Sequence, residues 1–170
     1  MKTIEDTLAP TRTQSRICAL RPRRPGDMGW VIQKHGALYH EEYGWDQTFI
    51  AADFIDQFDH ARERCWIAEA NGEPLGCIFL VKHPEQPDVA RLRLLLVEPA
   101  ARGLGVGTAL VRHRGQFARE AGYRKITLWT NSVLSSARRI YEHEGYCLMN
   151  ESLHQSFGKN LIGQTWELGL

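Results

Sequence analysis

The apolar and polar positions of the chain follow two periods, which predict strands and helices in a definite order. Short apolar runs of strand length lie at residues 89–97 and 125–130. Apolar side chains at helical spacing follow each run, at residues 106–122 and 132–144. The second half of the chain therefore alternates between strand and helix, as in a mixed α/β domain.

The first half of the chain begins with one predicted strand and two predicted helices. The strand covers residues 16–22. The first helix starts at Asp27, a favourable N-cap, and ends before Gly36, a residue that suits a helix C-terminus. The second helix covers residues 47–58, where the apolar side chains form one stripe that we interpret as core packing.

Short strands account for the rest of the pattern. Asn71 and Gly72 predict a two-residue hairpin turn, because both tolerate positive φ. The strands predicted on this basis are residues 65–70 and 74–81 around that turn, and residues 146–149 and 165–168 around a loop at residues 151–163.

Composition indicates a globular chain without a special partner class. Apolar residues make up 43% and charged residues 24% of 170 residues, and the net charge of +1 provides no field for nucleic acid or an anionic membrane. The four cysteines are far apart, which argues against a metal site or a disulfide framework. No apolar run has membrane-spanning length. We expect a cytoplasmic protein with a mobile tail at residues 1–15 and one domain at residues 16–170.

A glycine-rich turn follows the apolar run at residues 89–97. Pro99 ends that run, since proline has no N–H for a strand ladder. The free N–H groups at the start of the next helix favour an anion, and glycines let a phosphate approach the backbone. Arg102 adds a positive charge. The turn therefore predicts a phosphate site, with a tight strand-to-helix connection as the alternative; its glycines are Gly103, Gly105 and Gly107.

Two common phosphate motifs do not match this turn. A P-loop needs a lysine where the chain has Gly107 followed by Thr108. A dinucleotide fingerprint needs a third glycine where the chain has Leu110, and a carboxylate after the next strand, which ends instead at Asn131. Both motifs lack residues that carry their chemistry.

Two motifs resemble the GNAT N-acetyltransferases. Arg102-x-x-Gly105-x-Gly107 is similar to their acetyl-CoA pyrophosphate loop, and the run from Ala137 through Tyr141 to Tyr146 is similar to their final motif. The resemblance covers nearly all of residues 16–170. It implies a GNAT-like single α/β domain with a mixed, mostly antiparallel sheet of six to seven strands and about four helices.

A narrower resemblance involves shorter segments. Arg21-Pro22, Glu42 to Trp45, Leu128 to Asn131 and Thr165-Trp166 resemble the acetyltransferase half of bacterial MarR–GNAT fusion proteins. Too few residues precede the first strand for their winged-helix half, so we do not expect this chain to bind DNA.

The resemblance implies acetyl transfer from acetyl-CoA to a primary amine by direct attack in a ternary complex. The end of the strand at residues 89–97 would diverge from its neighbour and expose backbone groups to pantetheine. Leu134 stands where many GNATs have asparagine, and Asn131 could replace that contact. The implied cofactor contacts are Leu95, Leu96, Val97, Arg102, Gly103, Leu104, Gly105, Val106, Gly107, Thr108, Asn131, Ala137 and Tyr141.

The catalytic groups are less completely specified. Tyr141 matches the family's general acid, with a core tyrosine as the alternative. No carboxylate lies in the strand at residues 89–97, so Glu42 or Glu41 is the expected base, in competition with a water relay. Glu42 is the preferred base.

The acceptor site is read from neighbouring residues. Arg91 and Arg93 share one strand face and could bind an acidic acceptor or pair with surface carboxylates. The implied acceptor residues are Tyr39, Glu41, Tyr43 and Arg93. We expect a small-molecule or protein amine as partner; the sequence is also compatible with a homodimer and with a non-catalytic acetyl-CoA sensor.

Overall fold

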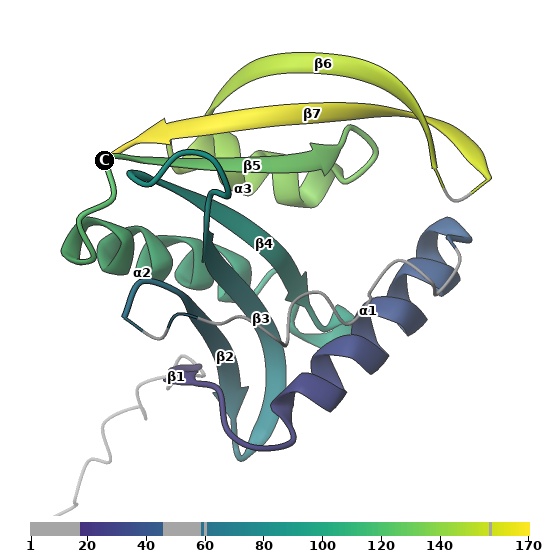
Figure 1. The fold of residues 1–170 in the computed structure, drawn as a ribbon. Coiled ribbons are helices and arrows are strands. Elements are labelled where there is room, and N and C mark those ends of the chain that lie inside the picture. Colours follow the sequence, from purple (N-terminus) through teal and green to yellow (C-terminus); the bar gives the residue numbers. More distant parts are fainter. Residues whose placement is uncertain (1–17, 46–58, 60, 157) are drawn as a thin grey trace, which may run out of the picture.

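A seven-stranded sheet forms the centre of the molecule, in the order β1-β2-β3-β4-β5-β7-β6 (Figure 1). The computed structural model describes residues 18–45, 59, 61–156 and 158–170. The strands are β1 (Ala19–Pro22), β2 (Arg64–Ala70), β3 (Glu73–Lys82), β4 (Val89–Val97), β5 (Lys125–Asn131), β6 (Cys147–Ser156) and β7 (Lys159–Gly169). The helices are α1 (Asp27–Tyr43), η3 (Pro99–Ala101), α2 (Val106–Glu120) and α3 (Ser135–His143).

The predicted fold class is confirmed. The β4–β5 pair is parallel and the other neighbouring strands are antiparallel, so the sheet is mixed and mostly antiparallel. The described residues contain three α-helices and one 3₁₀ helix. The helix predicted at residues 47–58 and the tail at residues 1–15 lie outside the described residues.

The helices cover opposite faces of the sheet. On one face, Val31 and Leu38 of α1 pack with Cys77 and Phe79 of β3. On the other face, α2 and α3 pack against Ile78 of β3 and against Ile126 and Leu128 of β5. Because successive strand residues point to opposite sides, the two clusters define an α1 face and an α2 face.

A bulge in β4 places one extra residue opposite β3. Cys77 pairs with Leu96 and Phe79 pairs with Arg93, so three steps on β4 oppose two on β3. Leu94 lies inside this bulge with φ 51°, a conformation that is rare for a bulky side chain and costs about 1–3 kcal/mol.

Just before that bulge, the pairing of β4 with β5 ends. Their parallel pairing ends at Leu92 and Leu128, although both strands continue. The remaining residues of β5 pair only with β7. The predicted divergence of these strands is confirmed, and the last residues of β4 face the gap without a strand partner there.

Helix α1 is longer than predicted. It continues through Gly36 and ends at Gly44, which has φ 64°. A glycine inside a helix costs about 1 kcal/mol, and burial of Leu38, two residues later, against the sheet offsets that cost. The predicted stop at Gly36 is therefore wrong, and the aromatic segment at residues 38–43 forms the last turns of α1.

The carboxyl-terminal strands are also longer than predicted. Residues 151–163, predicted as a loop, form most of a hairpin between β6 and β7. Most side chains of β6 are exposed, so its sequence lacks the alternation of apolar and polar residues that predicts a strand. The strand forms through backbone pairing with β7. Helix α3 begins at Ser135, three residues after the predicted start at residue 132, and its N-cap Leu134 provides no side-chain hydrogen bond.

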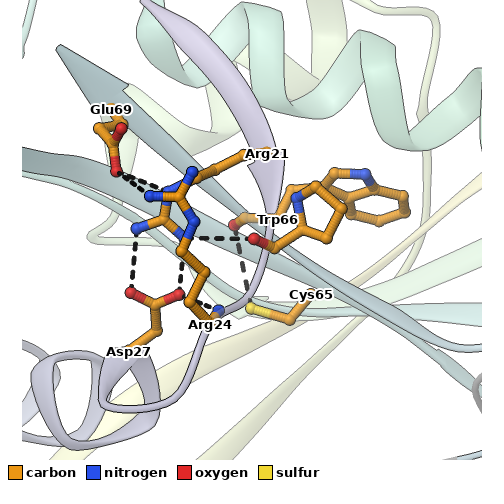
Figure 2. A network of polar contacts seen from close by, with 7 residues as sticks. Arg21, Arg24, Asp27, Cys65, Trp66 and Glu69 are labelled. Carbon is orange, nitrogen blue, oxygen red and sulfur yellow. Dashed lines mark hydrogen bonds and ion pairs between the residues drawn. The ribbon is translucent and has the colours of Figure 1, made fainter. Parts of the chain in front are cut away.

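An ion-pair network joins β1 to α1 and β2 (Figure 2). The Arg21 guanidinium donates to both carboxylate oxygens of Asp27, at 2.7 and 3.1 Å, and to Glu69 at 2.6 Å. The pKa of the Asp27 carboxyl is lowered chiefly by Arg21. Asp27 is the first residue of α1 rather than its N-cap, which is Gly26. Arg21 thus links β1 to the start of α1 and to β2.

A buried histidine lies in the middle of α1. The Nδ1 of His35 lies 2.9 Å from the Val31 carbonyl oxygen, and its Nε2 has no hydrogen-bond partner among the described residues. Burial lowers the pKa of His35 from 6.5 to about 4. The imidazole is therefore neutral in the folded chain throughout the range in which an exposed histidine gains its proton.

We expect this burial to make folding stability pH-dependent. Between about pH 6.5 and 4, unfolding takes up a proton at His35. The free energy of unfolding is therefore greatest above pH 6.5, and it decreases by up to about 1.4 kcal/mol for each unit by which the pH is lowered below that value. His35→Gln keeps an N–H donor for Val31 and should reduce this slope. Urea denaturation at several pH values measures it; parallel losses in both proteins would contradict the account.

Candidate functional site

A cavity of about 550 Å³ lies where α1, the end of β4, the glycine turn and α3 meet. Its lining includes residues 95–97 of β4, which lie beyond the last residue paired with β5, and the first turn of α2. The predicted residues that line it are Tyr39, Glu42, Tyr43, Leu95, Leu96, Val97, Arg102, Gly103, Gly105, Val106, Gly107, Thr108 and Ala137.

The glycine turn forms one wall of the cavity. Gly103 and Gly105 have φ near 78°, so a side chain there would be strained. Gly107 lies in the first turn of α2, where a Cβ would meet Ile140 Cδ1 at 2.7 Å. The turn thereby brings α2 and α3 together and directs the unpaired N–H groups of the helix start into the cavity. The Leu104 side chain is exposed and does not line it.

An ion pair crosses the mouth of the cavity. Arg102 Nη2 lies 2.6 Å from Glu42 Oε1, and Arg102 Nε donates to the Val97 carbonyl at 3.3 Å. Both side chains are partly exposed. The structure thus brings a predicted phosphate contact and the predicted base together, on opposite sides of one opening.

Tyr141 lies directly behind the cavity. It is 4% exposed and does not line the space itself, but its neighbours Ala137 and Ile140 do. Its ring lies 5.7 Å from that of Tyr146. Burial raises the pKa of Tyr141. Burial, and to a smaller extent the nearby Tyr141, raises the pKa of Tyr39, which lines the cavity. The hydroxyl therefore stays protonated at neutral pH, near the cavity wall.

A buried arginine on α2 was not found by the sequence pattern. Arg114 is fully buried, its Nη2 donates to the Tyr146 hydroxyl, and its Nε and Nη1 have no partner among the described residues. Burial lowers the pKa of Arg114 to about 9. Its positive charge lowers the pKa of Tyr141, but this effect is smaller than the increase caused by burial of Tyr141. His113 has helical spacing with the apolar residues of the segment 106–122, which predicts a partly buried histidine, whereas His113 is exposed. The buried position is the next residue, Arg114.

Asn131 contacts a histidine rather than the cavity. It is 3% exposed, and its Oδ1 accepts a hydrogen bond from His154 Nε2 at 2.8 Å. The other ring nitrogen of His154 lies 3.0 Å from Ser156 Oγ. The sequence did not single out His154, because β6 was not predicted there.

The remaining charged residues have separate positions. Glu41 is exposed and Arg93 is half-buried, and neither lines the cavity. Glu98, the carboxylate nearest the end of β4, pairs with Lys34 of α1 at 2.9 Å. The described residues contain no group of three potential metal ligands. Among the helices of this part of the chain, none is both long and apolar enough to cross a membrane.

Comparison with known sequences gives relatives among acetyltransferases. "N-acetyltransferase family 8 member 2" of Rattus norvegicus is 32% identical over 117 residues, covering 66% of this chain and 50% of the relative. "Mycothiol acetyltransferase" of Sanguibacter keddieii is 30% identical over 146 residues, covering 81% of this chain and 46% of the relative. The chain spans about half the length of these curated relatives.

Solved structures share the fold at low identity. "Ribosomal-protein-alanine N-acetyltransferase" from Brucella melitensis has a TM-score of 0.75 at 17% identity, covering 89% of this chain and 99% of that one. The yncA structure from Salmonella typhimurium, solved with its cofactor acetyl-CoA, has a TM-score of 0.76 at 16% identity, with 89% and 92% covered.

The family model of the comparison covers most of the chain. The "Acetyltransferase (GNAT) family" model matches residues 31–146, which include the cavity, the glycine turn and α3. The narrower likeness to MarR–GNAT fusion proteins stays a prediction from short segments. The chain therefore belongs to the GNAT family of acetyltransferases.

Proposed function

We propose that this chain transfers an acetyl group from acetyl-CoA to a primary amine. The observation that carries the proposal is one cavity that joins the glycine turn to the gap between β4 and β5. The glycine turn suits the diphosphate of acetyl-CoA, and the unpaired end of β4 beside it suits the pantetheine arm. The names of the relatives and the acetyl-CoA in the yncA structure agree with it.

The residues around the cavity fit the two halves of the cofactor. The N–H groups of the glycine turn and the start of α2 would bind the diphosphate, together with Arg102. Backbone groups of residues 95–97 would pair with the amides of pantetheine, because they have no partner on β5. Ala137 leaves room beside the arm, and Asn131 lies at the far side of the same gap.

The reaction needs two proton transfers. The amine nitrogen attacks the thioester carbonyl carbon, the C–S bond breaks, and the departing sulfur takes the hydroxyl proton of Tyr141. The proton lost by the amine goes to Glu42 or to water. Positioning the two substrates can lower the barrier by about 7–11 kcal/mol in well-oriented systems.

The ion pair gives Glu42 a defined role. A diphosphate in the turn would compete for Arg102 and release the Glu42 carboxylate toward the cavity. The acceptor would then meet a free base only when the cofactor is bound. Tyr39 and Tyr43 line the same end of the cavity and would form its wall, while Glu41 is exposed beside it.

Acetyl-CoA should stabilise the folded chain. At about 100 times Kd a ligand adds about 2.7 kcal/mol, which for a domain of this size raises the melting temperature by roughly 5–10 °C. A thermal melt with acetyl-CoA measures this, with ATP and NADH as controls. No rise with acetyl-CoA would contradict the proposed cofactor site.

Tyr141→Phe should lower kcat by about 10²–10⁴-fold, because the leaving thiolate loses its proton donor. Acetyl-CoA affinity should stay within about threefold, since the hydroxyl makes no hydrogen bond among the described residues. Tyr123→Phe is the matched control, because its hydroxyl bonds Arg62 away from the cavity. Equal kcat in both variants would remove Tyr141 from the mechanism.

Glu42→Gln should separate binding from chemistry. Acetyl-CoA should bind up to about fivefold more tightly, since Arg102 loses a competing, partly exposed ion-pair partner. The low-pH limb of the kcat profile should disappear with the loss of the base. Titration calorimetry and pH–rate measurements test these effects, with Glu73→Gln on the β2–β3 hairpin as control. An unmoved profile would assign the base to water.

A further inference from the structure

Two arginines of β4 lie on the α1 face, beside the helix. Arg93 pairs with Phe79 and Arg91 with Val81, and directly paired residues point to the same side of a sheet. Phe79 packs beneath α1. Both arginine side chains therefore emerge on the face from which the gap between β4 and β5 opens.

An aromatic side chain lies across that gap. Arg91 pairs with Thr127 of β5, so alternation puts Trp129 on the same face one step further. Trp129 is 46% exposed, and its ring lies on Gly163, where a Cβ would meet ring atoms at 2.7–2.9 Å. The edge-on ring of His154 lies 5.0 Å away. Gly163 and His154 thus hold an exposed indole next to the gap.

Two guanidinium groups lie two residues apart on this face, near the gap. Burial and the neighbouring Arg91 both lower the pKa of Arg93. Arg91 makes no ion pair or hydrogen bond with the described residues. Glu167 shares the face through its pairing with Thr127, and Lys125 binds its carboxylate at 2.9 Å. An anion placed between the two arginines would relieve their repulsion.

We propose that the amine acceptor carries a carboxylate, which Arg91 and Arg93 bind, and an apolar group, which packs on Trp129. The inference rests on the proposed acetyl transfer, because that reaction requires the acceptor nitrogen to lie at the gap, next to the thioester. Guanidinium groups match carboxylate geometry, and an indole gives a large apolar contact. Free amino acids with apolar side chains have this chemistry.

Matched acceptors test the carboxylate. Phenylalanine and tryptophan are compared with phenethylamine and tryptamine, which have the same ring and amine and no carboxylate, by release of free CoA thiol. Wild-type protein should show at least a tenfold higher kcat/KM for each amino acid, and Arg93→Met should reduce that ratio about tenfold. Arg93→Lys, which keeps the charge, should retain part of the ratio. Arg119→Met, which removes an exposed arginine of α2, should leave it intact.

The outcomes separate this inference from the proposed function. Equal or better use of the decarboxylated amines, or a ratio that Arg93→Met does not change in a variant that melts like wild type, would overturn the carboxylate site. Turnover of none of these acceptors, with a melting shift from acetyl-CoA, would also overturn it and leave the cofactor site standing. Absence of that melting shift would overturn the proposed acetyl transfer itself.

Discussion

The extra residue in β4 is the constraint on which the rest of the site depends. Leu94 adopts positive φ, and the parallel pairing with β5 stops two residues before it. The buried Cys77 thiol donates to the Leu94 carbonyl at 3.4 Å, which helps to hold this backbone. Without the bulge β4 would continue along β5, and the backbone of residues 95–97 would pair with that strand. The strain at Leu94 is thus located where the chemistry needs it.

Each face of the sheet has its own task around that gap. The α2 face supplies the glycine turn and the helix start, which line the cavity, and Tyr141, which lies behind its wall. The α1 face supplies Glu42 of α1, the two arginines of β4 and Trp129 of β5. The Glu42–Arg102 ion pair connects the two sides, since one partner belongs to α1 and the other to the turn. Lys159 at the tip of the β6–β7 hairpin donates to the Tyr43 carbonyl, so the end of α1 and the hairpin enclose the same region (Figure 1).

Local signals in the sequence were sufficient for the features made by neighbouring residues. The β4 strand, the turn at Gly103 and Gly105, and the helix after it follow from apolar runs and backbone requirements. Features that depend on distant pairing were missed: β6 has no apolar alternation, and Arg114 is buried only because α3 and Tyr146 pack over α2. Likewise, the extension of α1 past Gly36 depends on tertiary burial of Leu38, which outweighs local propensity.

Amide hydrogen exchange of the free and CoA-bound protein tests the central claim most directly. The account predicts slower exchange on CoA binding in two segments, residues 95–97 of β4 and residues 103–108 of the turn, since both gain hydrogen-bond partners. Amides of β6 should not change. Protection of the turn without any change at residues 95–97 would contradict the claim that the divergence of β4 from β5 forms the binding site.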